Sequence, residues 1–150
     1  MALPEAQVDL IEVTGRKCEV IARLASAAEL ATARAIPARA EEWALGEGAE
    51  AYDVVTARAL AALPVLAEYV APLLVLGGAL VAWKGTRDPD EERAGATAAE
   101  ALGLEARDPL PVRPFKGSRG RNLYVYVKTG PTPERFPRRP GMATKRPLGR

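Results

Sequence analysis

Histidine is absent from this sequence of 150 residues, and cysteine occurs once, as Cys18. Without histidine the chain cannot use Ser-His-Asp or Cys-His catalysis, and a structural zinc site would lack its usual nitrogen and sulfur ligands. One cysteine also excludes a disulfide scaffold, which needs paired cysteines. We therefore expect a protein of the reducing cytoplasm that holds no metal and whose chemistry needs no imidazole.

Long hydrophobic runs are also lacking. The one membrane-like stretch, residues 59–83, predicts a helix, a turn and a buried strand in place of a membrane span. It is interrupted by an acid, two prolines and a glycine pair: Glu68, Pro64, Pro72 and Gly77-Gly78. The first residues have neither a basic leader nor an apolar core, so nothing marks them for secretion. With 48% hydrophobic residues the chain is not disordered, and its length suits one globular domain.

Acidic residues are nearly absent from the C-terminal quarter. Up to Val112 the chain has 10 basic and 18 acidic residues, whereas the 38 residues after Val112 have 11 basic residues and one acid. Most of these cations are arginine, whose planar guanidinium binds phosphate and stacks on bases better than lysine does. This excess predicts a polyanionic partner, nucleic acid first, since each neutralised phosphate releases counterions. A solvated basic tail without a partner is the alternative.

Hydrophobic periodicity predicts strands that alternate with helices. Strands are expected at residues 8–12, 33–36, 52–56 and 79–83, and helices at 15–24, 63–74 and 90–102, with Gly77-Gly78 ending the second helix. Two further strands, 104–112 and 122–128, have no helix between them and should pair antiparallel around the basic loop 115–121. We expect one α/β domain over residues 1–128 and a basic Pro/Arg-rich tail over 129–150 that lies on its surface.

Strands alternating with helices imply a parallel sheet, whose ligands lie at the carboxyl ends of the strands. Four positions follow strand ends, and the coarse topology predicts that they share one rim: Glu12 to Thr14, Ala40-Glu41, Thr56 to Arg58, and Lys84-Gly85. Glu12 suits hydrogen bonding to the two hydroxyls of a ribose, with Val13 and Thr14 beside the nucleoside. Equally, Glu12 could be an acid favoured by the dipole at a helix N-terminus, with its neighbours packed as an ordinary loop.

The other rim positions also have two interpretations. Ala40 and Glu41 could contact an adenine edge, or Glu41 could simply open a short helix anchored by Trp43. Arg58 would either reach a ligand or form a structural ion pair. Lys84 would either reach across the rim or stand exposed at a strand end.

The basic C-terminal region contains two clusters that could hold a phosphate backbone. Glycines separate the cations of the first cluster, which precedes the strand aromatics Tyr124 and Tyr126. The second lies on a proline-stiffened segment, which costs little entropy to order. The candidate RNA-binding residues are Lys116, Arg119 and Arg121, then Arg138, Arg139, Lys145 and Arg146. A basic hairpin loop without a ligand is the alternative for the first cluster.

Taken in order, these segments resemble the bacterial small-subunit ribosomal RNA guanine-N7 methyltransferases, also called glucose-inhibited division protein B. The resemblance covers almost the whole chain, and its closing Pro-Arg-Arg-Pro-Gly and Lys-Arg-Pro-Leu motifs are the most specific. It is carried by Val8 to Glu12, Gly15-Arg16-Lys17, Arg39-Ala40-Glu41-Glu42, Ala57-Arg58-Ala59, Trp83-Lys84-Gly85, Arg121-Asn122-Leu123, Phe136 to Gly141, and Lys145-Arg146-Pro147-Leu148.

The resemblance implies a class I methyltransferase sheet of Rossmann-like topology, S-adenosylmethionine as methyl donor, and a guanine N7 of 16S ribosomal RNA in the small subunit as acceptor. By analogy Glu12 to Thr14 would face the ribose and adenine, Ala40 and Glu41 the adenine, and Arg58 the cofactor rim. Lys84 and the basic tail would face RNA. Guanine N7 has an exposed lone pair, so methyl transfer needs alignment and no general base, which agrees with the absence of histidine.

One departure from the family pattern concerns the N-terminal side. The family places a helical segment, a first strand and a Gly-rich loop before the strand that ends at Glu12, and this sequence contains none of them. In the family sheet that strand lies between the strands that end at Glu12 and Thr56, and its loop approaches the methionine part of the cofactor. We therefore expect this chain to be the C-terminal part of such an enzyme, and to bind S-adenosylmethionine poorly or not at all by itself.

Two functions from other classes remain open. A non-catalytic RNA-binding module would use the basic tail and leave Glu12, Glu41 and Arg58 with structural roles. A different nucleotide-using enzyme, such as a dehydrogenase, would need a dinucleotide-binding Gly-rich turn before Glu12. That turn is missing from this sequence as well, and nothing in the basic tail indicates a small-molecule substrate.

Overall fold

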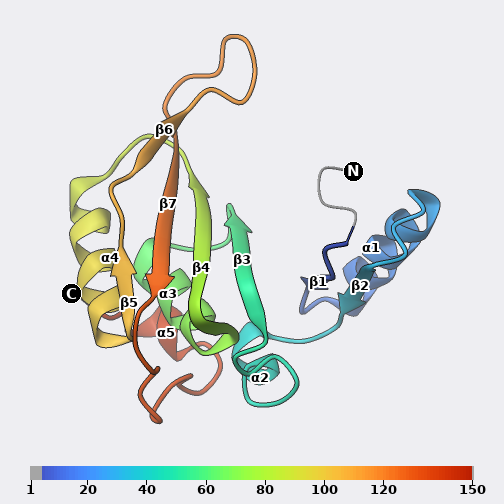
Figure 1. Cartoon of the computed structure of the whole chain (residues 1–150), viewed down its shortest axis with the longest axis horizontal. Helices are drawn as coiled ribbons and strands as arrows, with labels where there is room; N and C mark the ends of the chain where they lie inside the picture. Colours follow the sequence, from blue (N-terminus) through green and yellow to red (C-terminus); the bar gives the residue numbers. More distant parts are fainter. Residues whose placement is uncertain (1–4, 150) are drawn as a thin grey trace.

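The computed structural model describes residues 5–149, which form two sheets with helices (Figure 1). The strands are β1 (Val8–Ile11), β2 (Ala33–Ile36), β3 (Tyr52–Arg58), β4 (Leu74–Lys84), β5 (Leu104–Ala106), β6 (Leu110–Val112) and β7 (Arg121–Lys128). The helices are α1 (Gly15–Ala27), α2 (Ala40–Trp43), α3 (Leu63–Val70), α4 (Pro89–Ala101) and α5 (Met142–Lys145), with a 3-10 turn at Ala71–Leu73.

The main sheet has the strand order β3-β4-β7-β5, and β6 also pairs with β7. β3 and β4 are parallel, whereas β7 runs antiparallel to β4, β5 and β6. One face packs on α3 and α4, and the core between them includes the fully buried Leu66, Leu80 and Leu102. The aromatic side chains of Tyr124 and Tyr126 fill the β7 side of this core. The alternation of helix and strand, with the closing antiparallel hairpin, is therefore confirmed.

The strands β1 and β2 form a separate parallel pair with α1, to the right of the main sheet in Figure 1. Among residues 5–149, no hydrogen-bonded ladder joins β1 to β3. The link between the two sheets is made by side chains: the Tyr52 hydroxyl donates to Asp9 Oδ2 at 2.6 Å and accepts from Trp43 Nε1 at 2.6 Å. Asp9 also binds Arg34 of the neighbouring strand β2.

The second helix ends earlier than the sequence predicts. It stops at Val70, the 3-10 turn contains Pro72, and β4 begins at Leu74, so Gly77 and Gly78 lie inside a strand. They form a bulge, because the β3–β4 register passes from Tyr52 opposite Leu74 to Val54 opposite Ala79. Gly77 has a φ of +84°, and a Cβ at Gly78 would lie 2.9 Å from the Tyr52 carbonyl oxygen. The glycines thus allow a close strand crossing and do not end the helix.

Two other expectations need correction. The segment 104–112 is not one strand but two, β5 and β6, which are separated at residues 107–109 and pair with different parts of β7. The C-terminal segment is anchored and does not merely lie on the surface: Phe136 and Ala143 are buried, and α5 packs against α3. No helix in the described part of the chain is long and apolar enough to cross a membrane.

Candidate functional site

The carboxyl ends of β3 and β4 form the rim on which the candidate site is built. Arg58, the last residue of β3, is in register with Trp83 of β4, and Lys84 ends β4 opposite Asn122 of β7. Because β6 pairs with the start of β7, the β6–β7 hairpin rises from this same rim. Figure 1 shows its loop extending well beyond the ends of β3 and β4. The parallel strands therefore bring Arg58 and Lys84 to one edge, as predicted, and the antiparallel pairing of β7 adds the basic hairpin to that edge.

Lys84 is held by partners inside the protein. Its Nζ lies 2.6 Å from Glu91 Oε1 and donates to the Ala61 carbonyl at 3.3 Å. The same Glu91 oxygen accepts the Leu63 N–H at 2.8 Å, so one acid ties the end of β4 to the starts of α3 and α4. Lys84 is therefore not the exposed strand-end lysine of the alternative interpretation, and its contact with RNA stays a prediction.

Arg58 is exposed and followed by a strained residue. Ala59 has a φ of +52°, in the left-handed region, which costs a non-glycine residue about 1–2 kcal/mol. This conformation turns the chain out of β3 toward α3 and leaves the Arg58 guanidinium at the surface of the rim. Strain of this kind clusters at ligand sites, and Arg58 offers several N–H donors to an anionic group there.

A capped helix supports the rim from behind. The Asp88 side chain accepts the N–H groups of Asp90 and Glu91 and is followed by Pro89, which together begin α4. One turn on, Glu92 accepts two hydrogen bonds from Arg87 and one from the Tyr124 hydroxyl at 2.6 Å. These donors, Arg87 first, lower the pKa of Glu92 to about 2. Burial and the bond to Glu92 raise the pKa of Tyr124 to about 12.

The hairpin loop has a defined shape. The Ser118 N–H donates to the Phe115 carbonyl at 3.1 Å, which closes a turn with Gly117 at a φ of +86°, a conformation that favours glycine. Below the turn lies a hollow of about 420 Å³, lined by Pro111, Val112, Arg113, Ser118, Arg119, Gly120, Arg121 and Asn122. The Ser118 hydroxyl is buried there and has no hydrogen-bond partner among residues 5–149. Three guanidinium groups and this hydroxyl could therefore bind an anion.

Asn122 fixes the base of the hairpin to the rim. Its side-chain amide donates to the Gly85 carbonyl at 2.8 Å, and the residue is buried. The sequence assigned no role to Asn122 or Glu91, because the contacts that define their roles span 37 and 28 residues. It also missed Phe115, which is 66% exposed at the tip of the hairpin. An aromatic residue between Arg113 and Lys116 was the signal available for that position.

Glu12 lies on the other sheet, directly after β1. Its Oε1 accepts the Thr14 N–H at 2.8 Å, and Lys17 Nζ lies 4.0 Å from Oε2. The pKa of Glu12 is lowered, chiefly because its carboxylate accepts the Thr14 N–H. The carboxylate is therefore ionised at neutral pH and retains acceptor capacity for hydroxyl donors such as those of a ribose. Val13 and Thr14 are exposed beside it, as a nucleoside contact would require.

Ala40 and Glu41 do not share a rim with Arg58 in this structure. Glu41 is buried, and its carboxylate accepts the Gly141 N–H at 3.1 Å. The neighbouring Trp43 contacts Tyr52, the first residue of β3, whereas Arg58 is the last. The expectation of one shared rim is therefore not met. No ladder joins β1 to β3 among the described residues, whereas the segment after β2 is held to the main unit by backbone hydrogen bonds from Glu50 and Ala51 to Pro72 and Leu73.

The predicted RNA-binding residues fall into two groups. Lys116, Arg119 and Arg121 are exposed on the hairpin, and Arg139, Lys145 and Arg146 are exposed in the C-terminal segment. This segment contacts the end of α3 through the Tyr69 and Thr144 hydroxyls, so it lies near the amino end of β4, far from the hairpin (Figure 1). Arg138 points inward: its Nε and Nη2 bind Glu68 at 2.7 and 2.5 Å, and it also donates to the Arg146 carbonyl.

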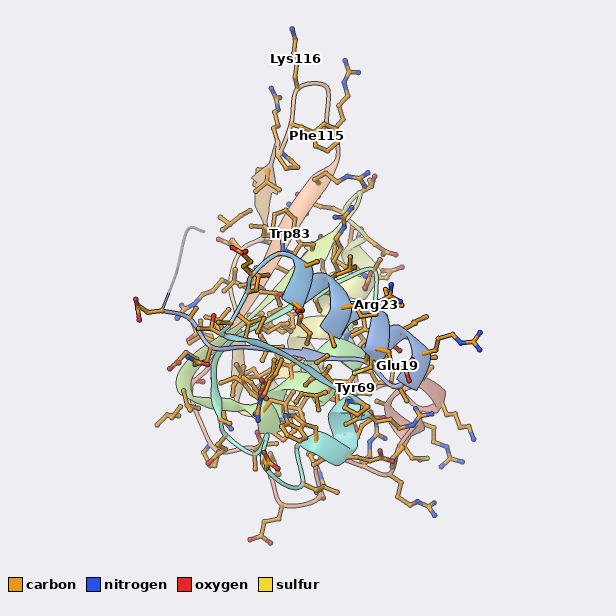
Figure 2. The ribbon with its side chains drawn as sticks, turned by 90° about the vertical axis from the view of Figure 1, so that its right-hand side faces the viewer. Glu19, Arg23, Tyr69, Trp83, Phe115 and Lys116 are labelled. Carbon is orange, nitrogen blue, oxygen red and sulfur yellow. The ribbon has the colours of Figure 1, made fainter. Side chains whose placement is uncertain are left out.

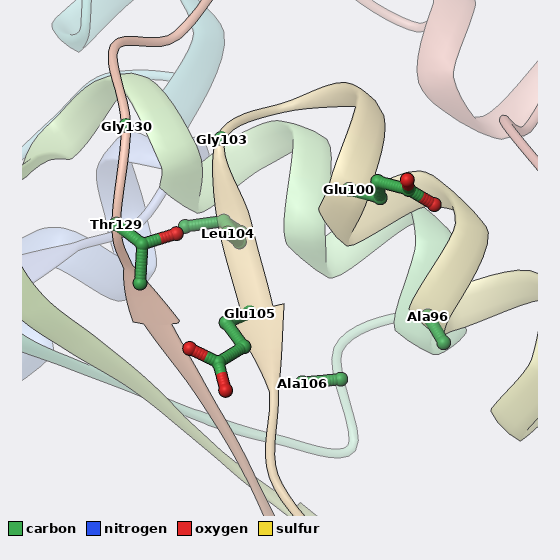
Figure 3. Close-up of a pocket in the computed structure, with 8 residues that line it drawn as sticks. All are labelled: Ala96, Glu100, Gly103, Leu104, Glu105, Ala106, Thr129 and Gly130. Atoms are coloured by element: carbon green, nitrogen blue, oxygen red, sulfur yellow. The ribbon is translucent and has the colours of Figure 1, made fainter.

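A second cavity of about 420 Å³ lies beside the start of β5 and the residues that follow β7 (Figure 3). It is shallow and lined by Ala96, Glu100, Gly103, Leu104, Glu105, Ala106, Thr129 and Gly130. Its charged side chains are Glu100 and Glu105, which would repel a polyanion. The cavity lies where β7 ends and β5 begins, whereas the rim lies at the start of β7, so the cavity does not belong to the rim.

The comparisons with known proteins identify relatives over nearly the whole chain. A ribosomal RNA small subunit methyltransferase G from Chloroflexus aggregans is 44% identical over 99% of this chain and 62% of its own length. The protein of the same name from Rubrobacter xylanophilus is 42% identical over 97% of this chain and 58% of its own length. The chain thus spans about 60% of the length of the relatives that it matches.

The fold comparison agrees. The crystal structure of the antibiotic-resistance methyltransferase Kmr matches with a TM-score of 0.66 at 18% identity, over 87% of this chain and 79% of Kmr. At that identity the likeness shows the fold, which is the class I methyltransferase fold. The family model described as GidB, rRNA small subunit methyltransferase G, matches residues 1–110. By its sequence and its fold, the chain belongs to the rRNA small subunit methyltransferase G family.

Proposed function

We propose that this chain contributes to the transfer of a methyl group from S-adenosylmethionine to guanine N7 of 16S ribosomal RNA in the small ribosomal subunit. One observation carries the proposal: on a chain of this family, a basic hairpin rises directly from the rim formed by the carboxyl ends of β3 and β4. Ligands of open α/β sheets bind at such a rim, and the hairpin brings cations to it.

The residues present fit part of the cofactor. Glu12 would hold the ribose hydroxyls, because its ionised carboxylate keeps free acceptor sites beyond the Thr14 N–H. Arg58 would offer donors to an anionic group of the cofactor. Ala40 and Glu41 remain proposed adenine contacts, although the Glu41 side chain is buried in this structure and already accepts the Gly141 N–H. When bound, S-adenosylmethionine supplies an electrophilic methyl group on a sulfonium.

The protein's contribution to the reaction is alignment. Guanine N7 presents its lone pair without losing a proton, so no residue of this chain is assigned as a general base. The exposed cations of the hairpin, Lys116, Arg119 and Arg121, would hold RNA phosphates beside the rim. We assign Lys84 and Arg138 to holding the protein together, because Glu91 and Glu68 already bind their charged groups.

Calorimetry with S-adenosylmethionine tests the proposal. The titration compares this chain with the same chain extended upstream by any coding sequence that precedes Met1, and methyl transfer to small ribosomal subunits is measured in parallel. Binding and transfer by the extended form, with weak or no binding by the 150-residue chain, would support the proposal. Micromolar binding by this chain alone would contradict the assignment of half a site to it.

A pair of variants tests Glu12 in the extended form. Glu12→Gln removes the ionised acceptor, and hydrogen bonds to a charged group contribute about 1.5–3 kcal/mol, so cofactor binding should weaken roughly tenfold or more. Glu19→Gln, an exposed acid on α1, should leave the affinity unchanged. Equal affinities for the two variants would assign Glu12 a structural role at the start of α1.

The second candidate function is a non-catalytic RNA-binding module. It is favoured by the basic hairpin, which has the same exposed cations with or without a cofactor. Salt-dependent binding of RNA by both forms, with no cofactor binding by either, would favour the module over the methyltransferase.

A further inference from the structure

The tip of the β6–β7 hairpin presents an aromatic ring to solvent. Phe115 is 66% exposed, and Figure 2 shows it with Lys116 at the end of the projecting arm, beyond Trp83 and away from the body of the protein. Phe115 lies outside the hydrophobic core of the described residues. A single exposed apolar residue is common in soluble proteins, so its surroundings decide its meaning.

Those surroundings are cationic and conformationally defined. Arg113, Lys116 and Arg119 lie within four residues of Phe115 in the same loop and are exposed, and the sequence has no acid from Pro109 to Pro133. Pro114 restricts the backbone directly before Phe115, and the bond from Ser118 N–H to the Phe115 carbonyl closes the turn directly after it. The ring is therefore presented by a shaped loop, which loses little entropy when a ligand binds.

An exposed aromatic ring among cations is the arrangement that binds single-stranded nucleic acid. Every base has a π-face that stacks on a phenyl ring, while flanking cations hold the phosphates on either side. We propose that Phe115 stacks on an unpaired base of the RNA, with Arg113, Lys116 and Arg119 holding the adjoining phosphates. The inference rests on the proposed function in taking RNA as the polymer, and it adds the residue that contacts a base.

The position of the β6–β7 hairpin connects the proposed stacking contact to the rim. The base of the hairpin is joined to the end of β4 by the pair Lys84–Asn122 and by the bond from Asn122 to the Gly85 carbonyl. A base stacked at the tip would therefore be tethered to the rim that carries Arg58. The β6–β7 hairpin would then recognise an unpaired nucleotide near the one that is methylated.

A binding cycle tests the stacking contact directly. Fluorescence anisotropy measures the affinity of the 150-residue chain for a short single-stranded oligoribonucleotide and for the same ribose-phosphate chain lacking its bases. Phe115→Ala should weaken binding of the complete RNA by roughly tenfold and leave binding of the abasic chain unchanged. Phe115→Trp should bind the complete RNA at least as well as the wild-type protein.

Salt dependence separates stacking from charge. Phe115→Ala should lower the affinity for RNA by the same factor at each salt concentration, whereas Lys116→Ala should reduce the slope of log affinity against log salt. The control Leu110→Ala removes another exposed apolar side chain from the same hairpin and should change neither the affinity nor the slope. Thermal melts confirm that each variant is folded.

The outcomes distinguish this inference from the proposed function. Equal effects of Phe115→Ala on complete and abasic RNA, or no effect on either, would overturn the stacking contact whether or not methyl transfer occurs. Alternatively, Phe115→Ala could weaken binding of complete RNA only, while the extended form neither binds S-adenosylmethionine nor transfers methyl groups. That result would contradict the proposed function and support the stacking contact.

Discussion

At the scale of single residues, the most informative contact is the ion pair between Arg138 and Glu68. Glu68 lies on α3 with its side chain 2% exposed, and Arg138 reaches it from the C-terminal segment. Removing one partner of a buried pair leaves the other charge uncompensated, which costs about 3–5 kcal/mol. Arg138→Gln should therefore lower the free energy of unfolding by about 3 kcal/mol in urea titrations.

The adjacent Arg139 provides the matched control, because its side chain is exposed. Arg139→Gln should change the free energy of unfolding by less than about 0.5 kcal/mol. Each variant loses one positive charge at neighbouring positions, so a general effect of charge would appear in both. Equal stabilities of the two variants would contradict a structural role for Arg138 and return it to the candidates for RNA contact.

Glu92 gives the protein a defined response to acid. Its pKa is about 2 in the folded protein, below its ordinary value of 4.5, because Arg87 and Tyr124 donate to the charged form. As the pH falls below about 4.5 the unfolded chain takes up the proton first, so the stability due to Glu92 is lost between about 4.5 and 2. Unfolding measured across this range should show the difference between wild type and Glu92→Gln shrinking with acid.

Tyr124→Phe refines the same prediction. It removes one of the donors to Glu92 and should move the lower end of the acid window up toward 4.5. A stability difference between wild type and Glu92→Gln that is the same at pH 7 and at pH 2 would contradict the assignment of this window to Glu92.

At the scale of elements, local signals were enough for most of the fold. The elements β1, α1, β3, α4 and β7 were readable because apolar residues recur along each at the spacing typical of its type. The bulge at Gly77-Gly78 was not, because it depends on how closely β4 approaches the Tyr52 carbonyl. The break between β5 and β6 was missed for a related reason, since it is defined by their pairing with different parts of β7.

The candidate site was predictable to the same extent. Arg58 and Lys84 follow strand ends, and the rule for parallel sheets placed them together. The position of the basic hairpin at the same rim was not predicted, because it depends on how β7 pairs with β4. The inward roles of Glu41 and Arg138 were not predictable, because their partners lie 100 and 70 residues away in the sequence. A charged side chain at the end of a strand can be recognised from the local sequence, whereas a contact between distant segments leaves no local signal.

The open edge of β3 leads to a prediction about amide exchange. β4 pairs with β3 on one side and β7 on the other, whereas β3 pairs with β4 alone among residues 5–149. In a parallel strand successive residues direct their backbone groups to opposite edges. Alternate amides from Val54 to Arg58 should therefore exchange rapidly, and those from Leu80 to Trp83 should all be protected. Uniform protection of β3 would show that its edge is covered in solution, for example by another copy of the chain.

At the scale of the whole molecule, stability is divided unequally between two units. The core of buried residues lies entirely at and beyond Ala57, whereas between Val8 and Ile36 only Cys18 and Ala25 are buried. Helix α1 leaves Val20 and Leu24 exposed, so the β1–α1–β2 unit has little apolar burial to stabilise it. Local opening of this unit should therefore need less free energy than opening of the main sheet.

Tyr52 is the side chain that joins the two units, and its removal tests the division. Tyr52→Phe deletes the bonds to Asp9 and Trp43, of which the bond to the Asp9 carboxylate is the stronger, at about 1.5–3 kcal/mol. Amide exchange in β1 and β2 should accelerate roughly tenfold or more, while exchange in β7 stays the same. Tyr69→Phe, which deletes a surface hydroxyl contact with Thr144, should leave both sheets unchanged. If β1 and β7 accelerate equally in Tyr52→Phe, the two sheets open together, and a single cooperative unit would replace the divided molecule described here.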